Sequence, residues 1–114
     1  MIMEDVIRSK SKYVRMAPRK VRLVVDLIRG MNALEAVEML KFVRKAAALP
    51  VSKTLKAAIA DAENNFNKDP EQLIIAEARV DGAPTLKRGR PVSRGRYHRI
   101  LKRSSHIVIG VKEK

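Results

Sequence analysis

A run of positive charge with no negative charge, from Gly82 to Lys112, constrains this chain more than any other feature of its sequence. The run contains nine Lys or Arg and no Asp or Glu. Residues 1–81 hold fifteen basic and eleven acidic side chains, so they supply only +4 of the net charge of +13. A segment of this charge repels itself, so it is not expected to fold tightly alone. The run therefore predicts a polyanionic partner.

Size and residue types narrow the class of protein. The chain has 114 residues, which suits one domain spanning residues 1–114, and its hydrophobic share of 46% suffices for a core in part of it. Cysteine is absent, which excludes disulfides and thiolate metal sites. No apolar run approaches the ~20 residues that span a bilayer, and the first residues lack the apolar stretch of a signal peptide. We expect a soluble intracellular protein without a membrane span.

Segments with strand-like alternation flank the basic run. One follows Pro70 and the other lies near the end of the chain. Pairing of residues 73–81 with 105–111 places the midpoint near residue 92, beside Pro91 in a cluster of Gly and Pro where a turn is expected. Each arm could extend roughly 40 Å at about 3.3 Å per residue, which is longer than a small core needs. The sequence thus predicts a body of about residues 1–81 and 104–114, and a hairpin of about 82–103 that projects from it.

Period-two patterns assign a face to each residue of these strands. A first strand is expected over Val6–Val14. One of its faces is basic and turned to solvent or a partner, with Arg8, Lys10 and Lys12; the other holds Ile7, Ser9, Ser11 and Tyr13. After Pro70, one face is expected to hold Ile74, Ala76, Ala78 and Val80, and the other Glu77, Arg79 and Asp81. In the last strand, Ile107, Ile109 and Val111 alternate.

Between the strands, capping residues and helical spacing predict three helices. The first begins at Pro18, ends at Gly30 and buries Val21, Val24, Val25 and Ile28. The second has Asn32 as its N-cap with Glu35 as capping-box partner, and an apolar stripe of Ala36, Met39, Leu40 and Val43. Pro50 is expected to mark the break before the third. That helix has Val51, Leu55, Ile59, Ala62 and Phe66 on one side and ends at Asn64 and Asn65.

The basic run has the chemistry of a phosphate-binding arm. Arginine can hold a phosphate with two parallel hydrogen bonds, and Gly89 and Gly95 allow close backbone approach. Tyr97 is the only aromatic residue of the run, which argues against a stacking platform for single strands and favours folded RNA or a duplex backbone. The side chains expected to meet phosphate are Lys87, Arg88, Arg90, Arg94, Arg96, Arg99, Lys102 and Arg103.

Catalytic and metal chemistry is not predicted. The two histidines, His98 and His106, lack the Cys and clustered carboxylates that would complete a metal site. Ser105 and His106 are consecutive strand residues that point to opposite faces, so they do not form a nucleophilic pair. No phosphate-binding loop or dinucleotide fingerprint occurs. We expect no enzyme, no cofactor and no metal.

Several motifs in order resemble one known family. Pro18–Gly30, with the sequence PRKVRLVVDLIRG, closely resembles the first-helix motif of the bacterial large-subunit ribosomal protein twenty-two family. Lys87-Arg88, Pro91, Gly95-Arg96 and Lys102–Ile107 resemble the C-terminal motif of the family at its spacing, and Ala57–Asn65 looks like its third helix. Val92-Ser93 and Tyr97 depart from the residues common in the family, Arg-Ala and a small residue.

The resemblance implies a fold and a place. The fold is α+β, with three helices packed on a small antiparallel sheet and a long projecting basic β-hairpin. The family implies binding to large-subunit ribosomal RNA, a role early in subunit assembly, and a hairpin tip that lines the nascent-peptide exit tunnel. It also implies neighbouring ribosomal proteins and the nascent polypeptide as partners, no homo-oligomer, and a cytoplasmic ribosome, with an organellar one left open.

Residue by residue, two sets of predicted site residues result. RNA contacts are expected on the body at Arg8, Lys10, Lys12, Arg15, Arg19, Lys20, Arg22 and Arg29, and on the hairpin at the eight cations named above. The tip that lines the tunnel is expected to consist of Lys87, Arg88, Gly89, Arg90, Pro91, Val92, Ser93, Arg94, Gly95 and Arg96.

Two other classes of function stay open on the residues alone. One is an architectural DNA-binding protein whose basic β-arm wedges Pro91 into a base step. Such arms usually act in symmetric pairs, and no dimer-forming face is evident. The other is a small hydrolase that uses His106.

Overall fold

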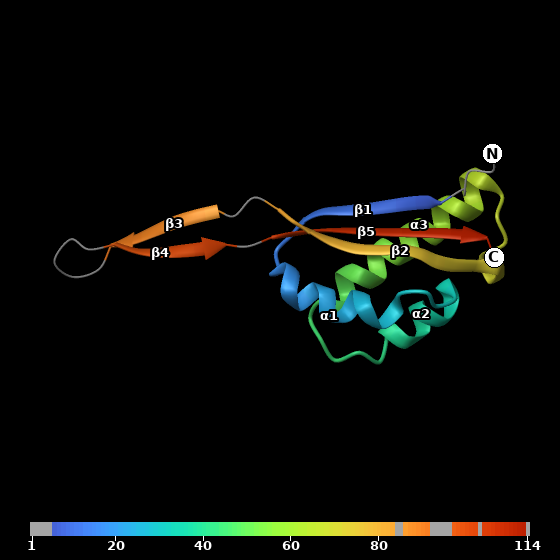
Figure 1. Ribbon diagram of the computed structural model, residues 1–114, viewed down its shortest axis with the longest axis horizontal. Helices are drawn as coiled ribbons and strands as arrows, with labels where there is room; N and C mark the ends of the chain where they lie inside the picture. The colour runs from blue at the N-terminus through green and yellow to red at the C-terminus, as the bar shows by residue number, and fades with distance from the viewer. Residues whose placement is uncertain (1–5, 84–85, 92–96, 103, 114) are drawn as a thin grey trace.

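The computed structural model describes residues 6–83, 86–91, 97–102 and 104–113. A three-stranded antiparallel sheet in the order β1-β5-β2 carries the helices, and a two-stranded ladder, β3-β4, extends away from it (Figure 1). The elements are β1 (Ile7–Val14), α1 (Pro18–Ile28), α2 (Ala33–Leu40), α3 (Ala48–Phe66), the 3-10 turn η1 (Pro70–Gln72), β2 (Leu73–Gly82), β3 (Leu86–Pro91), β4 (Tyr97–Lys102) and β5 (Ser105–Glu113). The α+β prediction is confirmed.

The molecule is longer than a compact domain of its size. Its principal extents are 63 × 34 × 21 Å and its radius of gyration is 17.4 Å. A compact domain of this length has a radius of gyration of about 13 Å. The difference reflects the ladder β3-β4, which lies beyond one end of the three-stranded sheet.

The register of β5 organises the sheet. It pairs with β1 from Ile7↔Val111 onward and with β2 up to Gly82↔Ser105, which confirms the predicted pairing of residues 73–81 with 105–111. The ladder β3-β4 continues antiparallel, and Pro91↔Tyr97 is its last described pair. Residues 92–96, where the turn was predicted, lie outside the described residues.

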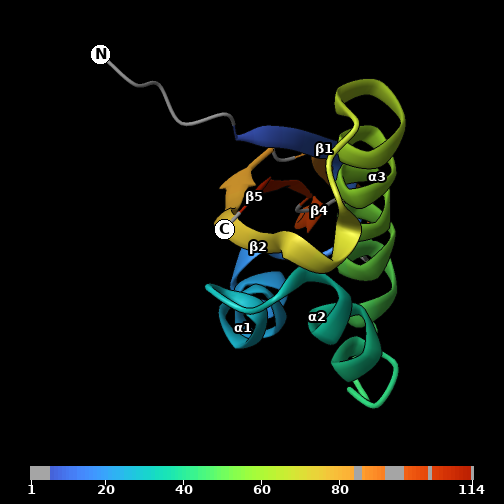
Figure 2. The same ribbon diagram turned by 90° about the vertical axis from the view of Figure 1, so that its right-hand side faces the viewer.

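The helices pack on the sheet from two directions. α3 lies against β1 and β5, and α1 lies along β2 (Figure 2). The predicted stripe of α1 is fully buried at Val21, Val24, Val25 and Ile28, where 3.6-residue periodicity places it. Gly30, with φ of +82°, ends the helix in the left-handed conformation that glycine adopts without strain.

The end of α1 leads directly into α2. Asn32 caps α2, since its Oδ1 accepts hydrogen bonds from the N–H groups of Leu34 at 3.0 Å and Glu35 at 3.4 Å. The predicted N-cap is therefore confirmed. Gly30 N–H donates to the carbonyl of Ile75, and Ile75 N–H donates to that of Met31 at 2.9 Å. The connection between the two helices is thus held to β2.

Three predictions for α3 are wrong at its ends. The helix begins at Ala48, so Pro50 lies in its first turn, where a missing N–H costs nothing, rather than at a break. It continues past Asn64 and Asn65 and ends at Asn67, with φ of +52°. Phe66, the last residue of the helix, is 53% exposed and so is not part of the buried side.

Two irregularities overturn predicted strand faces. The register of β2 shifts between Ile75 and Glu77, so Leu73 and Ile75 join Ala78 and Val80 in the core, and Ile74 and Ala76 do not. The register of β1 shifts between Ser11 and Val14. Tyr13 lies in this bulge with φ of +57° and is 62% exposed, so its assignment to the face of Ile7 is wrong.

Candidate nucleic-acid interface

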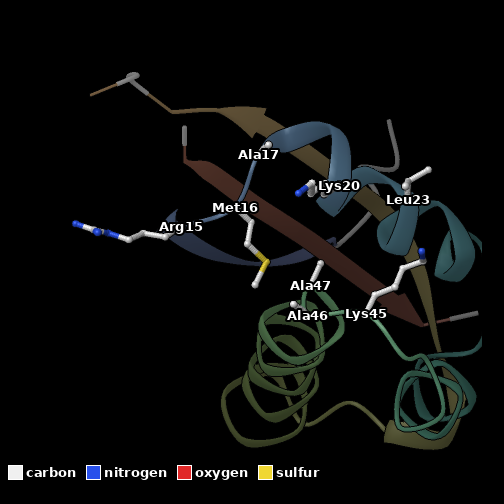
Figure 3. Close-up of a pocket in the computed structure, with 8 residues that line it drawn as sticks. All are labelled: Arg15, Met16, Ala17, Lys20, Leu23, Lys45, Ala46 and Ala47. Carbon is white, nitrogen blue, oxygen red and sulfur yellow. The ribbon is translucent and has the colours of Figure 1, made fainter. Parts of the chain in front are cut away.

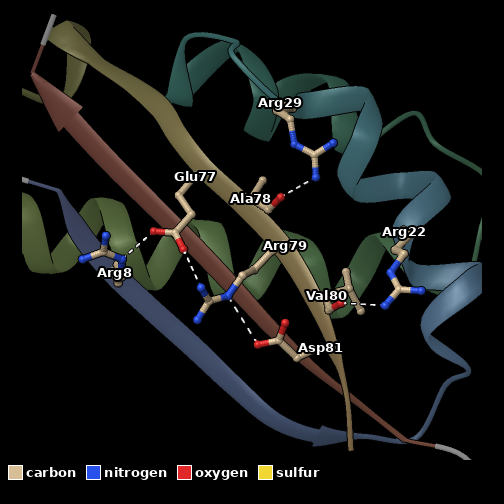
Figure 4. A network of polar contacts seen from close by, with 8 residues as sticks. All are labelled: Arg8, Arg22, Arg29, Glu77, Ala78, Arg79, Val80 and Asp81. Carbon is tan, nitrogen blue, oxygen red and sulfur yellow. Dashed lines mark hydrogen bonds and ion pairs between the residues drawn. The ribbon is translucent and has the colours of Figure 1, made fainter.

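The basic face predicted for β1 exists, and part of it is neutralised. Ser11 Oγ is 2.7 Å from Thr54 Oγ1 of α3, so Arg8, Lys10 and Lys12 lie on the side of β1 that faces away from α3. Arg8 Nε contacts Glu77 Oε2 at 2.5 Å across β5 (Figure 4). Arg8 therefore meets a carboxylate before it meets any phosphate.

The network continues along β2. Arg79 contacts Glu77 Oε1 at 3.0 Å and Asp81 Oδ2 at 3.3 Å. Two arginines and two carboxylates thus balance one another on this face of the sheet, over β5. The side chains of Lys10 and Lys12 have no hydrogen bond or ion pair with another described residue, so these two ammonium groups are free for phosphate.

Gly110 is what allows the network to cross β5. It stands between Arg8 and Glu77 in the register of the sheet. A Cβ built at Gly110 would lie 3.3 Å from Arg8 Cγ and 3.3 Å from Glu77 Cβ, and 2.6 Å from Val6 Cγ1. A side chain at this position would separate the two ion-pair partners.

Arg22 and Arg29 face the edge of β2. Arg22 Nη2 donates to the carbonyl of Val80 at 3.0 Å, and Arg29 Nη2 donates to that of Ala78 (Figure 4). Arg29 Nη1 also contacts Asp26 Oδ1 at 2.6 Å. These side chains satisfy carbonyls of an edge strand, which would otherwise be open to another chain.

The start of α1 carries cations without such partners. Arg15, Arg19 and Lys20 are exposed, and their side chains have no hydrogen bond or ion pair within the described part of the chain. The first turn holds no acidic residue, and the N-cap, Ala17, provides no side-chain hydrogen bond. The partial positive charge of the helix N-terminus therefore adds to that of the three side chains.

Further exposed cations were missed from the sequence. Four of them lie at or near the first half of α3: Arg44, Lys45, Lys53 and Lys56. Their side chains make no hydrogen bond or ion pair with another described residue. Lys53 and Lys56 could have been found, because they lie off the buried stripe of α3. Lys45 gives no such signal, since only the fold brings it near Lys20.

The hairpin places part of the predicted tip in register. Lys87, Gly89 and Arg90 lie in β3, opposite Leu101, Arg99 and His98 of β4. Arg88 and Pro91 belong to β3 as well, and Lys102 closes β4 opposite Leu86. Val92, Ser93, Arg94, Gly95, Arg96 and Arg103 lie outside the described residues.

His106 has a structural environment. Its Nδ1 accepts the backbone N–H of Tyr13 at 3.1 Å, and its ring meets that of Tyr13 edge to face, with centroids 4.8 Å apart. Ser105 Oγ donates to the carbonyl of Met16 at 2.6 Å. His106 and Ser105 are therefore each used to hold the β1 bulge and the segment that follows it.

The described residues hold neither a metal site nor a membrane-spanning helix. Among the described residues no group of three or more His, Asp or Glu is arranged to hold a metal ion. Within the same part of the chain, no helix is both long and apolar enough to cross a bilayer.

Comparison with known proteins decides the family. The model of the ribosomal protein L22p/L17e family matches residues 9–112, which is nearly the whole chain. The chain belongs to this family. The resemblance inferred from Pro18–Gly30 and the hairpin motifs is thereby confirmed.

Curated relatives agree with the L22p/L17e assignment. Large ribosomal subunit protein uL22 of Clostridium novyi is 54% identical over 107 residues, which cover 94% of this chain and 96% of the relative. The protein of the same name from Clostridium acetobutylicum is 52% identical and covers 91% and 94%, and that from Desulfitobacterium hafniense is 51% identical and covers 91% of each. As an L22p/L17e protein, the chain is a structural constituent of the large ribosomal subunit and not an enzyme. This excludes the hydrolase hypothesis.

Proposed function

We propose that the chain binds large-subunit ribosomal RNA through its hairpin and through the unpaired cations of its body, and that it supports early subunit assembly in a cytoplasmic ribosome. The observation that carries the proposal is the hairpin itself. Eight of the thirteen net positive charges fall in residues 84–103, and β3-β4 lies beyond the body, where a polyanion can surround it. Because the chain belongs to a family of ribosomal proteins, ribosomal RNA is the polyanion that we expect there.

The body offers a second contact region. Lys10 and Lys12 lie on the outer face of β1, and Arg15, Arg19 and Lys20 surround the start of α1. They are free of the ion pairs that occupy Arg8 and Arg79. We infer that the body orients the protein on RNA through these five cations, with Arg22 and Arg29 contributing any donors that the edge of β2 leaves free.

The salt dependence of RNA binding tests the hairpin contacts. Replacing Arg88, Arg94 and Arg96 with Ala should reduce the slope of log K against log salt by up to about 0.9 per lost duplex-phosphate contact. Arg79→Ala is the matched control, because its guanidinium is occupied by Glu77 and Asp81. An unchanged slope in the triple variant means that these side chains do not touch phosphate. Tighter binding to bent duplex DNA at equal salt would instead favour the architectural DNA-binding alternative.

We further propose that residues 87–96 line the exit tunnel and meet the nascent polypeptide. The support is the family motif that these residues share and the position of β3-β4 away from the body. A photoreactive amino acid at Ser93 in ribosomes stalled on a long nascent chain should crosslink to that chain. The same group at Gln72, which lies in η1 on the body, should not. Crosslinks from Ser93 to ribosomal RNA alone contradict tunnel lining and leave RNA binding intact.

A further inference from the structure

A groove separates the start of α1 from the segment that leads into α3. One wall is formed by Arg15, Met16, Ala17, Lys20 and Leu23, and the other by Lys45, Ala46 and Ala47 (Figure 3). Its volume is about 810 Å³. Sites for small molecules span about 300–1,000 Å³, so the groove is large enough for a group of that size.

The charges of the groove have one sign. Arg15, Lys20 and Lys45 are its charged lining residues, and no Asp or Glu of the described part of the chain lines it. None of these three side chains has a hydrogen bond or ion pair with another described residue. Lys20 and Lys45 come from opposite walls, and Arg15 extends outward at the rim. Three uncompensated cations around one hollow raise the local concentration of anions.

The other lining residues are apolar. A site for free phosphate alone does not need an apolar surface, so the lining favours an anion that also has an apolar part. Met16 points from the segment before α1 toward Ala46 of the facing wall (Figure 3). Leu23 is 55% exposed, although it belongs to a helix whose other apolar face is fully buried. Met has a flexible, polarisable side chain that adapts to the shape of its partner, and an unstacked RNA base offers a flat face to such a surface.

Both walls are held in place by the backbone around them. The carbonyl of Met16 accepts the hydroxyl of fully buried Ser105 at 2.6 Å, and Met16 N–H donates to Val14 at 2.8 Å. On the other side, Ala48 N–H donates to the carbonyl of Lys45 at 3.0 Å. The groove is therefore formed before a ligand arrives, which lowers the cost of binding.

We propose that this groove holds one unstacked nucleotide of ribosomal RNA. The base lies against Met16 and Leu23, and the flanking phosphates meet Lys20 and Lys45, with Arg15 on the next phosphate at the rim. The inference rests on the proposed RNA binding and names the site on the body that reads RNA shape. An acidic peptide fits less well, because acidic motifs are recognised mainly by clusters of arginine, and among the described residues Arg15 is the one arginine that lines the groove.

Base-specific chemical probing of deproteinised bacterial large-subunit ribosomal RNA tests the apolar wall. The full chain should protect the base of one or two nucleotides, and Leu23→Asp should restore their reactivity and weaken binding about fivefold. Leu27→Asp is the matched control, because Leu27 is 50% exposed one turn further along α1 and outside the groove. Equal protection in both variants overturns the proposal.

Paired lysines provide the control for the charges. Lys20→Ala with Lys45→Ala should expose the same nucleotides and lower the salt slope by up to about 1.4, or about 0.7 for each single-strand phosphate. Lys41→Ala with Lys68→Ala removes the same charge from lysines that contact Glu38 and Glu113, and should leave the footprint unchanged. Equal slopes and footprints in the two double variants overturn the proposal.

Crosslinking identifies the occupant directly. A photoreactive amino acid at Leu23 in assembled large subunits should crosslink to a single ribosomal RNA nucleotide, the same one that the full chain protects. Crosslinks to a protein segment overturn the nucleotide assignment. If the unmodified chain binds no ribosomal RNA, the proposed function fails as well; if it binds and only the Leu23 and lysine effects are missing, the groove proposal fails alone.

Discussion

Tyr13 occupies a backbone conformation that side chains disfavour. Its φ is +57°, in the left-handed region. Gly, Asn and Asp adopt this region readily, whereas other residues do so at a cost of roughly 1–2 kcal/mol. The residue is held there by the bulge of β1 and by the bond from its N–H to His106 Nδ1. Because the ring of Tyr13 is largely exposed, the backbone conformation at this position affects the free energy of unfolding more than burial of the ring does.

Comparison of two substitutions at Tyr13 isolates this strain. Both Tyr13→Gly and Tyr13→Ala remove the ring, but only Ala keeps a Cβ. We expect the Gly variant to be about 1 kcal/mol more stable than the Ala variant in denaturant unfolding, the reverse of the usual order for these residues. If Ala is the more stable, φ at position 13 is not positive in solution.

Gly110 and Gly82 form a second matched pair of positions. An added methyl at Gly110 meets Val6, Arg8 and Glu77, so Gly110→Ala should destabilise the fold by about 1–2 kcal/mol. At Gly82 nothing lies within 4 Å of an added Cβ, and Gly82→Ala should change stability by less than about 0.5 kcal/mol. Equal effects in thermal unfolding would show that Val6 and Arg8 move aside without cost.

At the scale of elements, the sheet ends where the hairpin begins. Gly82 pairs with Ser105, and Ala83 N–H donates to the carbonyl of Ser104 at 3.1 Å. A two-residue Asn-Gly turn suits a connection between antiparallel strands at such a point. Joining Ala83 to Ser104 by Asn-Gly in place of residues 84–103 should therefore leave the body folded.

Circular dichroism and thermal unfolding check this prediction. Helical signal from α1 to α3 should persist with a cooperative transition, because the described core residues lie in these helices and in the strands β1, β2 and β5. A noncooperative transition would mean that the body needs the hairpin to fold. The full chain, unfolded under the same conditions, is the reference.

The accuracy of the sequence-based predictions follows from what periodicity can show. The stripe of α1 was predicted residue by residue, because one helical turn repeats locally and Pro18 and Gly30 mark its ends. The faces of β2 were predicted only in part, because a bulge inserts one residue without a mark in the sequence. Exposure of Phe66 depends on what packs against the last turn of α3, which helical spacing does not encode.

The candidate interface shows the same division. Charge counting found the hairpin and the cations of β1, since a run without acids is visible in one dimension. It could not separate Lys10 from Arg8, whose ion pair with Glu77 joins residues 69 positions apart. Nor could it pair Lys20 with Lys45 across a groove, because their proximity depends on how α1 and α3 pack.

At the scale of the whole molecule, the body and the hairpin differ in both shape and charge. A body with a nearly balanced network on its sheet carries a hairpin, residues 84–103, that holds eight of the thirteen net positive charges. The body can therefore keep its fold over a range of salt, while binding through the hairpin weakens steeply as salt rises. The two parts should be separable in a binding experiment.

The variant with Asn-Gly in place of residues 84–103 measures that separation. It removes eight hairpin cations, so the slope of log K for ribosomal RNA against log salt should fall by up to about 7 if each meets a duplex phosphate. If the slope falls by less, the difference gives the number of hairpin cations that do not contact phosphate. Side chains that face a water-filled tunnel are expected to behave in this way. The slope of log K against log salt is measured by filter binding from low to moderate salt, with the Arg79→Ala full chain as control. An unchanged slope would assign RNA binding to the body alone and contradict the role proposed for the hairpin.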